Sequence, residues 1–285
     1  MDTQAGAPPD AFGIKGQNWS FPTYNWQRMQ ATGFAWWKQR FEQMGDYFDA
    51  FRIDHILGFF RIWSIPIDAV EGILGHFVPA IPVQLSELTQ LGIQFDHARF
   101  TKPFITDAVL RETFGQANVS AAKQNFLKQN RDGTYELKPE FASQRQVERY
   151  FGKSELNHQD KELRQGLYDL ISNVILLPDP DKPDAQFHYR FSAESTSSFA
   201  ALDRSTQAKL RDLYVDYFFR RQDEFWRKQG LQKLPALKRV TNMLVCGEDL
   251  GMVPGCVPET MEQLGLLSLE VQRMPKRLNT EFSSP

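Results

Sequence analysis

Cysteine is scarce in this sequence: only Cys246 and Cys256 occur among its 285 residues. A secreted domain held by disulfide bonds would carry more, so we expect a cytoplasmic location and two buried, reduced thiols. A run of about 18 apolar residues is also missing, so we expect no transmembrane helix. The first ten residues lack the basic and apolar segments of a signal peptide.

An excess of one charge is missing as well. The chain has 33 basic and 35 acidic side chains, a net charge of -2, and no block of like charge. A nucleic-acid or membrane partner is therefore not expected. The sequence lacks the G-x-G-x-x-G, P-loop and H-E-x-x-H motifs, and its 5 histidines show no metal-ligand spacing. We therefore expect no nucleotide cofactor and no metal.

Aromatic residues, in contrast, make up 13% of the chain. Tryptophan is concentrated near the start, at Trp19, Trp26, Trp36, Trp37 and Trp63. Such a cluster fits either a buried core or a set of platforms on which sugar rings stack, and the general tendency of aromatic residues to be buried favours the core.

The order of predicted elements favours an α/β fold. The Gly- and Pro-rich residues 1–25 predict a long ordered loop. Apolar runs predict strands within 47–54, 242–249 and 268–273. Helical periodicity predicts helices at 26–45, 160–173, 204–230 and 258–264. Since strands alternate with helices, we expect a parallel sheet or barrel.

The first candidate site is the sequence Phe-Arg-Ile-Asp at the end of a predicted strand. Side chains alternate along a strand, so Arg52 and Asp54 should point to the same face. The guanidinium would keep the Asp54 carboxylate ionised, as a glycosidic nucleophile requires. A purely structural ion pair at a strand end is the alternative.

The second candidate site is Cys-Gly-Glu-Asp, at the end of another apolar run. Asp249 next to Glu248 would favour the protonated form of Glu248, which suits a general acid. Acidic residues at a helix N-terminus are the alternative interpretation. Retaining glycosidases place two carboxylates about 5 Å apart, and both candidates could occupy one barrel mouth.

Three segments resemble glycoside hydrolase family 77, the 4-α-glucanotransferases or amylomaltases. They are GAPPDAFGIKGQNWSFPTYNW, FRIDHILGFFRIWSIP and CGEDLGMVPGCVP, in the order that the family has them. The long connection between the second and third segments is similar to the insertion-bearing members, such as the plant cytosolic disproportionating enzyme.

The resemblance implies a fold class of α/β, as a partial (β/α)8 TIM barrel covering about strands 4 to 6. It implies a large, mainly helical insertion at 70–235 between two catalytic barrel segments, 1–69 and 236–285. Asp54 would be the nucleophile and Glu248 the general acid/base. The implied substrate-binding residues are Arg52, His55, Asp249, Asp10, Phe12, Gln17 and Trp19.

The implied reaction is the retaining transfer of α-1,4-glucan units through a covalent glycosyl-enzyme, with no cofactor. Its substrates would be maltooligosaccharides and starch or glycogen-like α-glucans, and Phe12, Trp19 and Trp63 would shield the intermediate from water. The alternatives are an α-glucan hydrolase of the same clan and a non-catalytic glucan-binding fragment. The family's third carboxylate, in a Thr-His-Asp or Ser-His-Asp motif, has no match here, so we expect this chain alone to be an incomplete transferase.

Overall fold

The computed structural model describes residues 3–152 and 155–272 of the chain. These residues form two compact units. Among them, unit 1 consists of 3–23, 63–152 and 155–220, and unit 2 consists of 24–62 and 221–272. Each unit is therefore made of two stretches of chain that lie far apart in the sequence.

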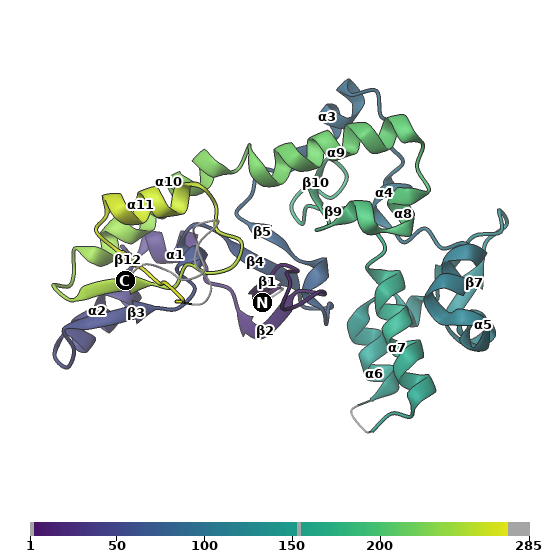
Figure 1. Cartoon of the computed structure of the whole chain (residues 1–285), viewed down its shortest axis with the longest axis horizontal. Helices are drawn as coiled ribbons and strands as arrows, with labels where there is room; N and C mark the ends of the chain where they lie inside the picture. The colour runs from purple at the N-terminus through teal and green to yellow at the C-terminus, as the bar shows by residue number, and fades with distance from the viewer. Residues whose placement is uncertain (1–2, 153–154, 273–285) are drawn as a thin grey trace. The chain divides into compact units, whose positions relative to one another are not determined.

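Unit 2 is built on a small parallel sheet (Figure 1). Its strands are β3 (Ala50–Ile53), β11 (Leu244–Gly247) and β12 (Leu267–Ser268), in the order β12-β11-β3. Both pairs of neighbours are parallel. Its helices are α1 (Trp26–Ala31), α2 (Ala35–Gly45), η1 (Ile56–Phe59), α10 (Asp223–Lys238) and α11 (Cys256–Gln263). The predicted α/β class is confirmed.

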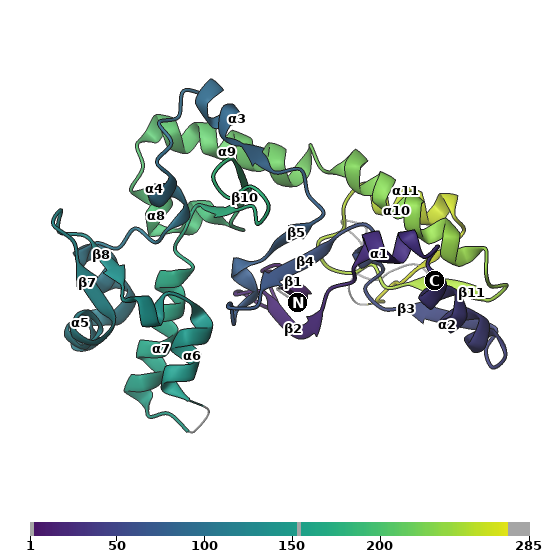
Figure 2. The ribbon, with the colours of Figure 1, turned by 180° about the vertical axis from the view of Figure 1, so that it is seen from behind.

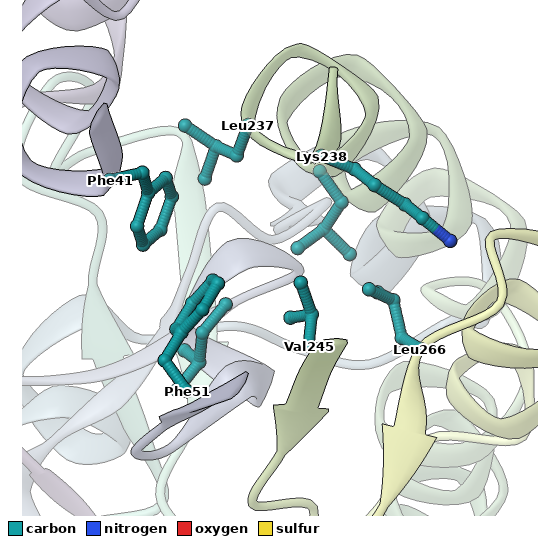
Figure 3. Close-up of a pocket in the computed structure, with 8 residues that line it drawn as sticks. Phe41, Phe51, Leu237, Lys238, Val245 and Leu266 are labelled. Carbon is teal, nitrogen blue, oxygen red and sulfur yellow. The ribbon is translucent and has the colours of Figure 1, made fainter. Parts of the chain in front are cut away.

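One face of this sheet packs against helices. Phe51, Ile53 and Val245 are buried on it, while Arg52 between them is exposed. Figure 3 shows Phe51, Val245 and Leu266 turned toward Phe41 of α2 and Leu237 of α10, which together line one small pocket. The predicted alternation of β3 is therefore confirmed.

The predicted single helix at 26–45 is wrong, because α1 and α2 are separate. Gly33 and Phe34 have φ values of 60° and 60°. This left-handed conformation cannot continue a right-handed helix. The predicted helix at 258–264 is confirmed as α11 with slightly different bounds. The third predicted strand is reduced to β12, and residues 273–285 of its flank lie outside the described residues.

The described residues of unit 1 form three small sheets. The first contains β1 (Thr3–Ala7), β2 (Gln17–Pro22), β4 (Ile62–Pro66) and β5 (His76–Val78), in the order β2-β1-β4-β5. A second sheet has β6 (Val83–Gln84), β10 (Gln186–Tyr189) and β9 (Leu176–Pro178) in the order β6-β10-β9, and β7 (Leu127–Gln129) pairs with β8 (Tyr135–Leu137). β1 is antiparallel to β2 and β4, β10 is antiparallel to β6 and β9, and β7 is antiparallel to β8.

The helices of unit 1 are α3 (Leu85–Gln90), α4 (His97–Thr101), α5 (Asp107–Phe126), α6 (Gln144–Phe151), α7 (His158–Ile171), α8 (Ser197–Ala200) and α9 (Arg204–Phe219), with short 3-10 turns η2 (Gly72–Leu74), η3 (Pro139–Phe141) and η4 (Ala193–Ser195). Helices α6 and α7 lie side by side, and α5 packs on α7 (Figure 2). Leu110, Phe126 and Leu167 are among the residues of their shared core. No helix in the described part of the chain is long and apolar enough to span a membrane.

The predicted loop at 1–25 is wrong, because it contains the antiparallel strands β1 and β2. The two strands pack so closely that a Cβ on Gly6 would lie 2.0 Å from the carbonyl oxygen of Gln17. Glycine is therefore part of the hairpin, although its high content in this segment is typical of loops.

The predicted helix at 160–173 is confirmed as α7. The predicted helix at 204–230 is two helices, α9 and α10, separated at residues 220–222. Within the described residues of 70–235, the strands β5 to β10 pair outside the parallel sheet of unit 2. Whether 70–235 is an insertion in a barrel stays a prediction.

Candidate functional site

Two carboxylates follow neighbouring strands of the parallel sheet. Ile53 at the end of β3 is the register partner of Gly247 at the end of β11. Asp54 and Glu248 directly follow the ends of β3 and β11. Because adjacent strands lie about 4.8 Å apart, the backbones of Asp54 and Glu248 lie side by side at the carboxyl edge of the sheet. The fold thus brings together two residues that are 194 positions apart in the sequence.

Backbone amides hold the Glu248 side chain. The N–H of His55 donates to Oε2 of Glu248 at 2.9 Å, and the N–H of Leu250 donates to Oε1 at 3.0 Å. The main chain continues the ladder, since Glu248 N–H donates to the Ile53 carbonyl and Ile56 N–H donates to the Glu248 carbonyl, both at 2.9 Å. The turn after β3 therefore fixes the position of Glu248.

Asp54 has a different environment. Its Oδ1 lies 2.7 Å from Nη2 of Arg52, and its side chain is 79% exposed. The carboxylate thus has a close cation on one side and open access from solvent. An exposed ion pair of this kind contributes little to stability, about 0–1 kcal/mol, so stability alone gives little reason for Asp54 to be there.

His55 directly follows Asp54, and its N–H contacts the Glu248 carboxylate. Its backbone is left-handed, with φ 48° and ψ 58°. Burial lowers the pKa of its imidazole to about 4, with a further contribution from the positive charge of Arg61, while Asp54 opposes the shift. The ring is therefore neutral near pH 7. A neutral ring can both donate and accept a hydrogen bond.

Asp249 is buried and bonds the end of strand β12. Its carboxylate accepts hydrogen bonds from the Ser268 hydroxyl at 2.9 and 2.8 Å and from the Leu269 N–H at 3.0 Å. These bonds connect the loop after β11 to the end of β12. Asp249 thus organises the edge of the sheet, and its predicted contact with sugar stays a prediction.

The other predicted binding residues belong to unit 1, in and beside the β1–β2 hairpin. Asp10 Oδ1 accepts the N–H groups of Phe12 and Gly13 at 2.8 and 2.7 Å. Phe12 is 79% exposed. Trp19 donates its indole N–H to Gln17 at 3.1 Å. Their role in binding stays a prediction, since Asp54 and Glu248 belong to unit 2.

The prediction that Trp63 shields a reaction intermediate is wrong. Trp63 is 1% exposed, and its indole N–H donates to the Gly72 carbonyl at 2.8 Å in the interior of unit 1. Gly75 packs so tightly on the ring that a Cβ there would lie 2.4 Å from Nε1. Trp63 is a core residue, as the burial tendency of aromatic residues indicates.

Two buried cations near the site were missed by the sequence interpretation. Arg61 is 4% exposed, donates to the Met252 carbonyl at 2.5 Å and lies over the Trp226 ring at 4.6 Å. Burial lowers its pKa to about 9. Lys233 is also 4% exposed. The sequence did contain an indication that Lys233 is buried, because Trp226 and Lys233 are seven residues apart and share one face of a helix.

Comparisons with known proteins show the family of this chain. The family model for glycoside hydrolase family 77, described as 4-alpha-glucanotransferase, matches residues 1–285. The 4-alpha-glucanotransferase DPE2 of rice (Oryza sativa subsp. japonica) is 43% identical over 100% of this chain and 30% of its own length. The chloroplastic/amyloplastic 4-alpha-glucanotransferase of potato (Solanum tuberosum) is 28% identical over 75% of this chain and 43% of its own.

Among solved structures, an amylomaltase from Streptococcus agalactiae in complex with acarbose matches 75% of this chain and 50% of its own, at 17% identity and a TM-score of 0.26. That score is too low to define the fold. The chain spans 30% and 43% of the length of the rice and potato proteins.

Proposed function

Because the chain belongs to the 4-alpha-glucanotransferase family, glycoside hydrolase family 77, we propose that it carries the nucleophile and the general acid/base of a retaining α-1,4-glucan transfer. The observation that carries the proposal is the strand register, which sets Asp54 and Glu248 beside each other at one sheet edge. Two carboxylates at such an edge can act on one glycosidic bond from both sides.

In the proposed reaction, Asp54 attacks the anomeric carbon while Glu248 protonates the leaving sugar oxygen. The glycosidic bond breaks and a covalent glycosyl-enzyme forms. Glu248, now a carboxylate, takes the proton from the 4-hydroxyl of an acceptor sugar, and this oxygen displaces Asp54 with overall retention. Each Glu248 oxygen accepts one backbone N–H group and keeps a second lone pair that can carry the transferred proton.

We also propose that β3, β11 and β12 correspond to about strands 4 to 6 of a (β/α)8 barrel. They are parallel, and their order in the sheet follows their order in the chain, as in a barrel. Helices separate them along the chain, and the strands β4 to β10 also lie between β3 and β11. In this proposal 1–69 and 236–285 are barrel segments, and 70–235 is the inserted region together with connecting helices.

The proposed substrates are maltooligosaccharides and starch or glycogen-like α-glucans, used in the cytoplasm. Arg52, His55 and Asp249 would support the reacting sugar from unit 2. Asp10, Phe12, Gln17 and Trp19 would contact the glucan from the β1–β2 hairpin, where the exposed Phe12 ring offers an apolar surface for a sugar face.

The test uses the protein expressed from its full reading frame and incubated with maltotriose, with and without isotopically labelled glucose. We expect longer maltodextrins, and label incorporated at their reducing ends. Release of glucose and maltose without incorporation would identify a hydrolase instead. Binding of maltotriose without turnover would identify a glucan-binding protein, and either result would overturn the proposal.

A further inference from the structure

One face of α10 packs against the end of η1 and the residues that follow it. Along this face, Trp226, Gly230 and Lys233 are spaced by four and three residues, so they form a single stripe. Trp226 lies under the Arg61 guanidinium, at 4.6 Å. Gly230 faces the Phe60 ring so closely that a Cβ would lie 2.4 Å from it. Lys233 contacts the residue before Phe60.

The Lys233 ammonium is buried, with the residue 4% exposed. Its Nζ donates to the carbonyl oxygen of Phe59 at 2.8 Å and lies 4.9 Å from the Trp26 ring centroid. Both are weak partners for a cation compared with a carboxylate. Burial accordingly lowers its pKa to about 8. A buried charge of this kind is costly to maintain, and an apolar side chain would fill the same place in the stripe.

The carbonyl that Lys233 contacts is well placed to influence the site. Phe59 is the last residue of η1, a four-residue turn that starts at Ile56. The start of the same turn is tied to the site, since Ile56 N–H bonds the Glu248 carbonyl and His55 N–H bonds the Glu248 carboxylate. Asp54 is the residue before His55. The anchored carbonyl of Phe59 and the His55 amide that holds Glu248 are therefore only four positions apart.

Arg61 extends this connection to the second loop. Its Nη2 donates to the carbonyl of Met252, in the loop that follows Glu248 and Leu250. The stripe on α10 therefore anchors the chain after Asp54 directly and the chain after Glu248 through Arg61.

We propose that Lys233 is a positioning residue for the transfer reaction: its buried ammonium fixes the end of η1, and thereby the turn that carries Asp54 and holds the Glu248 carboxylate. The inference rests on the proposed function for its effect on rate. It also makes a claim about local order that is independent of activity.

The replacement Lys233→Met separates positioning from stability, because methionine keeps an unbranched apolar chain and removes the charge. Relief from burying the charge offsets the loss of the hydrogen bond to the Phe59 carbonyl. We therefore expect an unchanged or higher Tm. The kcat for maltotriose should fall about ten- to hundredfold, the size of effect that a misplaced catalytic group produces, with KM within about twofold of the original value.

The matched control is Lys228→Met on the same helix. Lys228 is 66% exposed and makes only a long contact of 3.8 Å with Glu224, so its loss should leave kcat unchanged. Hydrogen exchange gives the second readout. In Lys233→Met the amides of residues 54–61 should exchange faster than in Lys228→Met.

The outcomes divide as follows. If the unmodified protein transfers glucan and Lys233→Met has the same kcat and the same exchange, the inference is overturned while the proposed function stands. A lower Tm with unchanged kcat per folded molecule would make Lys233 a stabilising residue only, which also overturns it. If the unmodified protein transfers no glucan, the proposed function fails, and unchanged exchange in Lys233→Met would then remove the remaining claim.

Discussion

Two polar clusters, one in each unit, contain similar side chains in opposite settings. In unit 1, His188 bonds Asp179 at 2.9 Å and the Tyr217 hydroxyl at 2.8 Å, and its ring stacks on His76 at 4.1 Å. In unit 2, Asp54 is paired with Arg52 and is 79% exposed. The unit 1 cluster has the carboxylate–histidine–hydroxyl order of a nucleophile relay, yet its hydroxyl belongs to a residue that is 1% exposed.

Access from solvent and unused hydrogen-bonding capacity distinguish a reactive carboxylate from a structural one. The Asp179–His188–Tyr217 cluster is closed within the core, and both ring nitrogens of His188 have partners. Breaking such a network costs stability, because a buried polar group loses its partner. The Asp54 carboxylate lies at a sheet edge and is 79% exposed, so we expect the loss of its charge to change the free energy of unfolding by less than about 1 kcal/mol.

The largest expected effect comes from replacing the aspartate of each cluster by asparagine. Asp54→Asn should reduce kcat by roughly four orders of magnitude or more, as loss of a catalytic group does, with Tm nearly unchanged. Steady-state transfer from maltotriose and thermal melting measure the two quantities.

Asp179→Asn is the matched control, with the opposite pattern. It leaves His188 with a weaker partner in the core, so we expect a loss of about 1–3 kcal/mol in the free energy of unfolding and an unchanged kcat per folded molecule. If Asp179→Asn lowers kcat without lowering Tm, the division between the clusters is wrong.

The second effect is acid destabilisation of unit 1. Burial, with the neighbouring His188, lowers the pKa of His76 to about 3. In the unfolded chain His76 binds a proton below about pH 6.5, whereas in the folded chain it stays neutral down to about pH 3. The free energy of unfolding therefore has its full value above pH 6.5 and decreases as the pH falls toward 3. At pH 5 the deficit for this one group is about 2 kcal/mol.

His76→Phe keeps a ring in the stack and removes the titration. Urea unfolding at pH 7 and pH 5 measures the change in each protein. The original protein should lose about 2 kcal/mol more than the variant between these pH values; equal losses would mean that His76 is accessible to protons in the folded state.

A third, smaller effect concerns the support of the nucleophile. Arg52→Ala removes the cation beside Asp54, so we expect kcat to fall about ten- to hundredfold through misplacement of the carboxylate. The free energy of unfolding should change by less than about 1 kcal/mol, because the pair is exposed.

Arg227→Ala provides the control for Arg52→Ala. Arg227 forms an equally short ion pair, 2.7 Å from Glu224, on the surface of α10. Its removal should leave kcat unchanged. Equal losses of kcat in the two variants would show that the effect arises from general surface charge instead of the Arg52–Asp54 contact.

The smallest effect tests the edge of the sheet. Ser268→Ala removes the hydroxyl that donates to Asp249 and leaves the Leu269 amide in place. We expect a loss of about 1 kcal/mol in the free energy of unfolding, measured by urea denaturation, and a change in kcat smaller than that of Arg52→Ala. A larger rate loss than that of Arg52→Ala would place Asp249 closer to the chemistry than this structure does.

The sequence by itself determined the features that depend on neighbouring residues. The α/β class, the helix α7 and the two strands that end before Asp54 and Glu248 all followed from local periodicity, because the spacing of apolar residues reports the face that an element buries. The candidate pair of carboxylates was visible for the same reason, as each acid directly follows an apolar run.

Only the tertiary structure decided what depends on distant partners. The β1–β2 hairpin forms in a segment rich in glycine because β1 also pairs with β4, and Asp249 is buried because Ser268 and Leu269 bind it. The spacing from Trp226 indicates which face of α10 carries Lys233, but only the tertiary structure shows that its ammonium contacts the carbonyl of Phe59, 174 residues away. Burial is set by which elements pack together, and the local pattern carries no record of a partner so remote in the chain.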